Sequence, residues 1–138
     1  MGVGNVLRGD DGVGPFVAEE IEGDEWLGLD CSTAPGKFTS KVKRREPELL
    51  VIVDAAKMGK EPGDRGILDY NQADRAFLST HTIPISVTAK YLSQYCKKLL
   101  FIGIEPKEIM DREGLSKAVY QSARELVNIL KDGRFGDI

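Results

Sequence analysis

Apolar residues along the chain fall into two kinds of pattern. The runs Leu49–Ala55 and Leu99–Ile104 are almost wholly apolar, which is typical of strands buried on both faces of a parallel sheet. Elsewhere apolar residues recur every three or four positions, which predicts amphipathic helices. The predicted helices span Gly14–Ile21, Phe38–Glu46, Ile83–Tyr95 and Ser116–Lys131.

Weaker apolar segments complete the pattern. They predict strands at Met1–Val6 and Trp26–Ser32 and a candidate edge strand at Gly66–Tyr70, with a loop over Gly59–Gly66. Alternating strands and helices favour an α/β fold. We therefore predict a single domain over 1–138, a three-layer sandwich with a mostly parallel twisted sheet of about five strands flanked by helices. Function in such sheets collects beyond the carboxyl ends of the strands.

Turn and capping residues support these boundaries. Pro15 suits the first position of a helix, where its missing N–H costs nothing. Pro47 closes the second helix, Ser116 is the predicted N-cap of the last helix, and Gly133 ends it.

Charge and composition exclude several classes of partner. Hydrophobic residues make up 41% and charged residues 30% of the chain, and the net charge is −3. The basic cluster Lys41, Lys43, Arg44 and Arg45 is followed at once by acidic residues, so we interpret it as a solvated face. We expect no nucleic-acid partner. No apolar run approaches the roughly 20 residues of a membrane span, and no signal peptide is recognisable, so a cytoplasmic protein is expected.

The chain has two cysteines, Cys31 and Cys96, without C-x-x-C spacing. Both lie in apolar segments, and we expect them to be reduced, buried and inert.

The segment 2–14, Gly-Val-Gly-Asn-Val-Leu-Arg-Gly-Asp-Asp-Gly-Val-Gly, is the most informative stretch. Its glycines permit a tight backbone path and the close approach of another molecule. Asp10 and Asp11 lie in the middle of this path. A negative charge before a helix N-terminus is favourable by about 0.3–1 kcal/mol, so we assign Asp10 to a structural role at the helix end. Asp11 is left for chemistry.

Asp11 follows the first predicted strand and Asp54 ends the run of 49–55, so both are expected above the same sheet edge. His81 is the one histidine of the chain and lies among small polar residues just before a helix. Asp11, Asp54 and His81 form a set of two oxygen ligands and one nitrogen ligand that suits a divalent transition metal, nickel and zinc alike. On spacing alone this set is weakly specific, because any chain offers three polar residues.

Other common chemistries lack their motifs. A single histidine excludes H-E-x-x-H, and no G-x-S-x-G elbow is present. The first loop lacks the third glycine of G-x-G-x-x-G and carries acidic residues that repel phosphate.

Four segments in register resemble a known family. They are 2–14, the Val-Ile-Val-Asp-Ala-Ala run that contains Asp54 and is followed by Met58-Gly59, Ser79-Thr80-His81, and Phe101-Ile102-Gly103-Ile104-Glu105-Pro106. Together they are similar to the [NiFe]-hydrogenase maturation endopeptidases, in particular those that process large subunits of the formate-hydrogenlyase type. The resemblance covers nearly the whole chain. Relatives normally carry several more residues before the Gly-x-Gly-Asn element, so the first strand is expected to be short here.

The resemblance implies a nickel-dependent endopeptidase that removes the C-terminal extension of a [NiFe]-hydrogenase large-subunit precursor after nickel insertion. It implies that Asp11, Asp54 and His81 are both the catalytic and the metal-binding residues. Two carboxylates and an imidazole match free nickel poorly, so we expect the nickel to be shared with the precursor. Other divalent metals are expected to substitute for it. A monomer is expected, with no membrane partner.

The chemistry of the metal stays open at this point. It can polarise the scissile carbonyl, generate hydroxide, or serve only to dock the precursor. A non-catalytic nickel-sensing chaperone that binds the precursor on the same fold is the alternative. A nucleotide-binding domain is disfavoured by the glycine spacing and the acidic pair.

Overall fold

The computed structural model describes residues 1–79 and 83–138 and is built on one sheet, with strand order β2-β1-β3-β5-β4. The described strands are β1 (Gly2–Val3), β2 (Asp30–Ser32), β3 (Leu49–Ala55), β4 (Arg65–Leu68) and β5 (Lys98–Ile104). All pair in parallel except β4, which is antiparallel to β5 at one edge. The predicted α/β class and mostly parallel sheet are confirmed.

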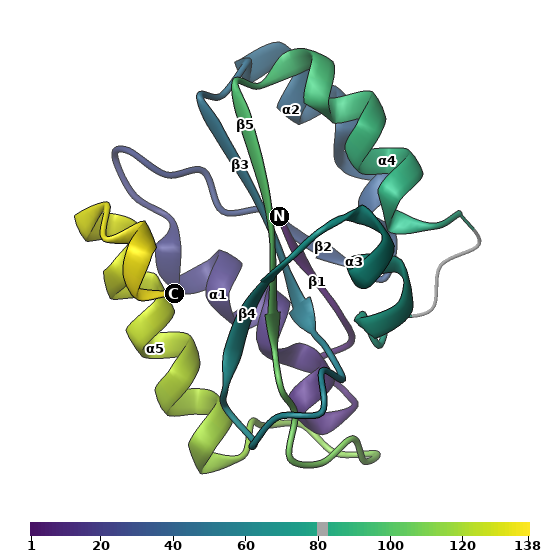
Figure 1. Cartoon of the computed structure of the whole chain (residues 1–138), viewed down its shortest axis with the longest axis vertical. Coiled ribbons are helices and arrows are strands. Elements are labelled where there is room, and N and C mark those ends of the chain that lie inside the picture. Colours follow the sequence, from purple (N-terminus) through teal and green to yellow (C-terminus); the bar gives the residue numbers. More distant parts are fainter. Residues whose placement is uncertain (80–82) are drawn as a thin grey trace.

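Helices cover both faces of the sheet (Figure 1). Helices α1 (Val13–Ile21) and α5 (Lys117–Asp132) lie on one face, and α2 (Thr39–Arg45), α3 (Tyr70–Ala76) and α4 (Ile85–Leu92) lie on the other. Alternate residues of β3 enter the two cores: Leu50 and Ile52 pack on the α2–α4 side, while Val51 and Val53 pack on the α1–α5 side. This two-sided burial explains why 49–55 is almost continuously apolar.

Most predicted elements are present, with shifted ends. Short 3₁₀ turns adjoin three of the helices, at η1 (Gly9–Gly12), η2 (Pro35–Phe38) and η3 (Ser93–Tyr95), and a further turn, η4 (Phe135–Asp137), follows Gly133. The last of the predicted helices ends at Gly133, in the left-handed region, as expected. The α4 helix is shorter than the predicted Ile83–Tyr95, because Pro84 is its N-cap and η3 continues it.

Two sequence predictions are wrong in detail. The strand predicted over Trp26–Ser32 is only Asp30–Ser32, because Gly28 packs directly on α1: a Cβ at Gly28 would lie 1.8 Å from the Ala18 carbonyl oxygen. The edge strand predicted over Gly66–Tyr70 ends at Leu68, where α3 begins instead. Asp69 and Gln72 form a capping box at the start of α3, a D-x-x-Q signal that the hydrophobic pattern did not reveal.

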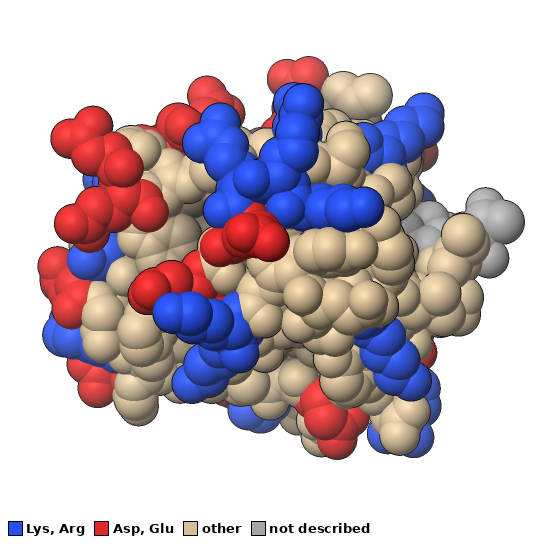
Figure 2. All heavy atoms as spheres, turned by 90° about the horizontal axis from the view of Figure 1, so that it is seen from above, with Lys and Arg blue, Asp and Glu red and all other residues tan. Residues whose placement is uncertain are grey.

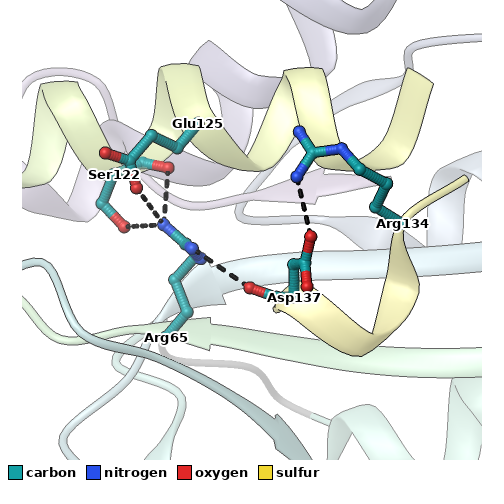
Figure 3. Close-up of polar contacts among 5 residues, drawn as sticks. All are labelled: Arg65, Ser122, Glu125, Arg134 and Asp137. Atoms are coloured by element: carbon teal, nitrogen blue, oxygen red, sulfur yellow. Dashed lines mark hydrogen bonds and ion pairs between the residues drawn. The ribbon is translucent and has the colours of Figure 1, made fainter. Parts of the chain in front are cut away.

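The edge strand β4 is fastened to α5 by Arg65 (Figure 3). Its guanidinium donates to Ser122 Oγ at 3.1 Å and to Glu125 Oε2 at 3.0 Å, and it reaches the Asp137 carbonyl oxygen at 3.5 Å. The Arg134–Asp137 ion pair at 2.8 Å braces the turn beyond α5. Within the described part of the chain, no helix has the length and apolar character needed to cross a bilayer.

Candidate active site

The carboxyl ends of the strands bring Asp11 and Asp54 together. Asp54 is the penultimate residue of β3 and is fully buried, and Asp11, in η1 after β1, is 5% exposed. Ser79 Oγ lies 3.0 Å from Asp54 Oδ1 and 3.5 Å from Asp11 Oδ1. The two carboxylates predicted to meet at this edge therefore share one hydroxyl neighbour. His81, the third predicted ligand, lies outside the described residues.

Ser79 is delivered to the carboxylates by a short antiparallel ribbon. Segment 76–78 pairs with the continuation of β3: Leu78 N–H donates to the Ala55 carbonyl at 3.0 Å, and Lys57 N–H donates to the Ala76 carbonyl at 2.9 Å. At the end of this ribbon the Ser79 N–H donates to Asp54 Oδ2 at 3.3 Å while its hydroxyl contacts Oδ1. Ser79 thus clamps both oxygens of Asp54 and fixes the orientation of this carboxylate.

Asp11 is positioned by a tight crossing of the backbone. A Cβ at Gly4, whose φ is +144°, would lie 1.9 Å from the Asp11 carbonyl oxygen, so only glycine allows the exit of β1 to pass η1 this closely. The Asn5 N–H then donates to Asp11 Oδ2 at 3.2 Å. The glycines of 2–14 therefore place a carboxylate beside Asp54, which is the geometry that the first loop predicted.

Asp10 has the structural role expected of it, but at a different helix. Its Oδ2 accepts hydrogen bonds from the N–H groups of Lys107 and Glu108 at 2.9 and 3.1 Å, and its Oδ1 accepts from Ser116 N–H at 2.7 Å. Ser116 is the N-cap residue of α5, but its hydroxyl donates to Asp10 at 2.8 Å and makes no cap bond to its own helix. Asp10 therefore orders the approach to α5, whereas the sequence suggested the N-terminus of the helix that follows Asp11.

Burial dominates the electrostatics of the acidic pair. Desolvation raises the pKa of Asp54 well above its ordinary value, the charge of Asp11 raises it further, and the Ser79 hydrogen bonds oppose both effects. Two neighbouring buried carboxylates are costly when both are ionised. A divalent cation between them would remove that cost, and carboxylate oxygens are suitable ligands for it. The donor set thus fits a metal, although the described residues alone contain no cluster of three histidine, cysteine, aspartate or glutamate side chains that could hold one.

The loop after Asp54 is held in place by Gly103 and Glu105, at the end of β5. Glu105, 7% exposed, accepts from the N–H groups of Met58 at 2.8 Å and Lys60 at 3.0 Å. Gly103 makes room for the start of this loop, since a Cβ there would lie 2.6 Å from Ala56 Cβ. The sequence marked Gly103 and Glu105 only as part of a resemblance, and their contacts now explain why these residue types are needed.

The cysteines offer no nucleophile. Both are free; Cys31 is buried and Cys96 is half-buried rather than buried as expected. Burial raises the pKa of Cys31 to about 11 and also raises the pKa of Cys96. Thiols with raised pKa values are poor nucleophiles at neutral pH.

The fold and this site define an α/β protein with a buried acidic pair above the carboxyl edge of a parallel sheet. Residues 17–132 match the family model of the hydrogenase maturation proteases. The chain belongs to the hydrogenase maturation protease family.

Individual relatives agree with this assignment. A Methanocaldococcus jannaschii protein named provisionally as a hydrogenase maturation protease is 34% identical, covering 94% of this chain and 83% of the relative. The hydrogenase 3 maturation protease of Escherichia coli is 33% identical, covering 75% of this chain and 69% of the relative. Among solved structures, the endopeptidase HycI of Escherichia coli superposes with a TM-score of 0.83 at 28% identity, over 95% of this chain and 86% of that one. The HycI [NiFe] hydrogenase maturation protease of Thermococcus kodakarensis gives a TM-score of 0.81 at 29% identity, over 95% and 87% of the two chains.

Proposed function

We propose that this protein is a nickel-dependent endopeptidase that removes the C-terminal extension of a [NiFe]-hydrogenase large-subunit precursor once nickel has been inserted. Family membership supports the hydrolytic activity and the kind of substrate. The observation that carries the proposal is the buried pair Asp11 and Asp54, joined through Ser79 at the carboxyl edge of the sheet. Two adjacent buried carboxylates destabilise a fold when both are ionised, and such arrangements are typical of functional sites.

Asp11, Asp54 and His81 are the residues that would hold the metal. When bound, the metal would supply Lewis-acid polarisation of the scissile carbonyl or a lowered pKa of water. Both cysteine sulfurs contact backbone carbonyls, of Leu29 and Leu92. Because the set Asp11, Asp54 and His81 contains no thiolate, we propose that nickel arrives as part of the substrate, coordinated by the precursor's own thiolates. The protease then recognises the nickel-loaded precursor.

The chain's own residues have separable tasks in this scheme. The two bonds from Ser79 hold the Asp54 oxygens in one orientation. Because burial favours the protonated form of Asp54, this carboxyl can hold a proton until a positive charge approaches the pair. Proton release at Asp54 would then be coupled to the presence of the metal-loaded precursor. We expect the protein to act as a monomer in the cytoplasm.

The decisive experiment mixes the protein with nickel-loaded precursor and weighs the large subunit by mass spectrometry. The expected result is loss of the C-terminal extension with wild type, no loss with Asp11→Asn, and normal loss with Asp24→Asn, which changes an exposed carboxylate. An unchanged large subunit that still binds the protein would favour the nickel-sensing chaperone. Tight binding of nickel to the isolated protein by calorimetry would overturn the shared-nickel part of the proposal.

A further inference from the structure

A second feature, beside the edge strand β4, is a basic groove. It has a volume of about 360 Å³ and lies between the loop after β3, the outer edge of β4 and the end of α3. Three cations line it, Lys57, Lys60 and Arg75, over an apolar floor that includes Met58 and Leu68. We call this feature the Lys57 groove.

The charge of the Lys57 groove is all of one sign. Among the residues that the structure describes, no acidic side chain lines it, although the chain as a whole carries a net charge of −3. Across residues 1–79 and 83–138, none of its three cations makes an ion pair. Three exposed cations around one groove, without an acidic partner among the described residues, favour an anionic group as the ligand.

The Lys57 groove rests on a fixed base. The bonds from the N–H groups of Met58 and Lys60 to Glu105 hold the backbone of its loop. The side chains of both residues lie over Gly66 of β4, where a Cβ would stand 3.1 Å from Met58 Sδ and 3.6 Å from Lys60 Nζ. The backbone of the loop is therefore held in place, and the Met58 side chain and the Lys60 ammonium lie over β4.

The Lys57 groove and the acidic pair lie at the two ends of one ribbon. Asp54 and Ser79 stand at one end, and Lys57 and Ala76, which line the groove, stand at the other. Three residue steps of extended chain, from 54 to 57, separate them by about 10 Å. The sheet gives the same spacing, since Asp54, Gly103 and Gly66 are register partners on three adjacent strands, and two strand spacings are also about 10 Å.

We propose that the Lys57 groove binds an acidic side chain of the peptide segment that the protease cleaves, about three residues from the scissile bond. This inference rests on the proposed function and specifies its substrate: an extended segment with Asp or Glu at that distance. The apolar floor contacts the methylene groups of the acidic residue, and the three cations neutralise its carboxylate.

Peptide binding tests the groove without any cleavage. The probes are two synthetic peptides, acetyl-Ala-Leu-Glu-Ala-Glu-amide and its counterpart with both Glu replaced by Gln, titrated into the isotopically labelled protein and followed by NMR. The acidic peptide is expected to shift the amide signals of Lys60 and Gly66 in a salt-dependent way, and the Gln peptide to leave them unshifted. Equal shifts with both peptides, or no shifts at the groove with either, would overturn the proposal.

Cleavage of the nickel-loaded precursor tests its use. The double variant Lys57→Glu/Arg75→Glu is expected to raise KM about tenfold with little change in kcat, since two exposed ion pairs are lost and the reversed charges repel the acidic residue. The matched control is Lys43→Glu/Arg44→Glu in α2, which lies at the upper end of the molecule in Figure 1. The molecule seen from that end shows a cluster of basic side chains (Figure 2). This control is expected to leave KM unchanged.

The two experiments separate the two proposals. If the wild-type protein does not cleave the precursor, the proposed function is contradicted. The peptide titration then still tests whether the Lys57 groove binds acidic side chains. Normal cleavage with equal KM for wild type and Lys57→Glu/Arg75→Glu overturns the groove proposal and leaves the protease intact.

Discussion

Asp10 and Asp54 are both buried carboxylates at the same end of the sheet, yet their surroundings differ. Asp10 accepts hydrogen bonds from three backbone N–H groups and one hydroxyl, and these join two distant loops. Asp54 accepts from both donors of one residue, Ser79, and faces a second carboxylate, Asp11. Burial raises the pKa of Asp54 well above its ordinary value.

The difference separates a structural carboxylate from a chemical one. A carboxylate surrounded by several donors from different segments stabilises the fold, because each donor would be unsatisfied without it. A carboxylate held in one orientation beside another negative charge is a cost to the fold, and such costs are typical of functional sites. Activity is therefore expected to depend on Asp54, and stability on Asp10.

The largest effect is expected from Asp54→Asn. The amide keeps the shape of the carboxylate but removes the charge that would bind the metal-loaded precursor, so the rate of precursor cleavage should fall by about 10²–10³-fold, as when one preorganised electrostatic group is lost from an active site. Mass spectrometry of the large subunit over time measures this rate. Circular dichroism should show a fold like that of wild type, and cleavage at the wild-type rate would contradict the assignment of Asp54.

Asp10→Ala is the counterpart on the structural side. It leaves the N–H groups of Lys107, Glu108 and Ser116 without their acceptor, so the free energy of unfolding should fall by about 3 kcal/mol. Urea denaturation measures this change. The control Asp24→Ala, at an exposed carboxylate, should stay within about 0.5 kcal/mol of wild type, and an Asp10→Ala variant that also does so would show that water replaces the carboxylate.

A smaller effect is expected from Ser79→Ala, which acts on Asp54 through its orientation. Loss of the hydroxyl removes the 3.0 Å contact with Asp54 Oδ1, and loss of such a supporting hydrogen bond typically costs about 10–100-fold in metal affinity or activity. Ser79→Thr keeps the hydroxyl and should recover most of the cleavage rate. The affinity for the nickel-loaded precursor and the kcat of its cleavage are the two measurements; equal values for Ser79→Ala and wild type would mean that the N–H of Ser79 suffices.

The sequence predicted the sheet well because its signals are local. The continuous apolar run of 49–55 needs no partner to be recognised as a buried strand, and it became β3 with the predicted bounds. The end of that strand also placed Asp54 at the carboxyl edge, where the glycines of 2–14 bring Asp11. Both predictions follow from strand direction and chain path alone.

The remainder depends on contacts between residues far apart in the chain. The sequence around Ser79 does not indicate that segment 76–78 pairs with segment 55–57, and this pairing places Ser79 beside Asp54. Asp10 was correctly taken as structural, but its partners lie about a hundred residues away, so the local rule of helix-end charges chose the wrong helix. The α3 helix was missed because its seven residues, Tyr70–Ala76, carry little apolar periodicity.

The pH dependence of stability should also depend on Asp54, by less per pH unit than the effects above. Because the pKa of Asp54 is raised in the folded state, the folded protein binds more protons than the unfolded one between the unfolded pKa, about 3.9, and the folded value. In that window the free energy of unfolding falls as pH rises, with a slope of at most one proton, about 1.4 kcal/mol per pH unit. Asp54→Asn lacks this group, so its free energy of unfolding relative to wild type should increase as pH rises through the window and then level off. Urea denaturation of both proteins from pH 4 to 8 measures the difference. A constant difference across this range would show that Asp54 is as easily ionised in the fold as in the unfolded chain, and the contrast with Asp10 would then rest on hydrogen bonds alone.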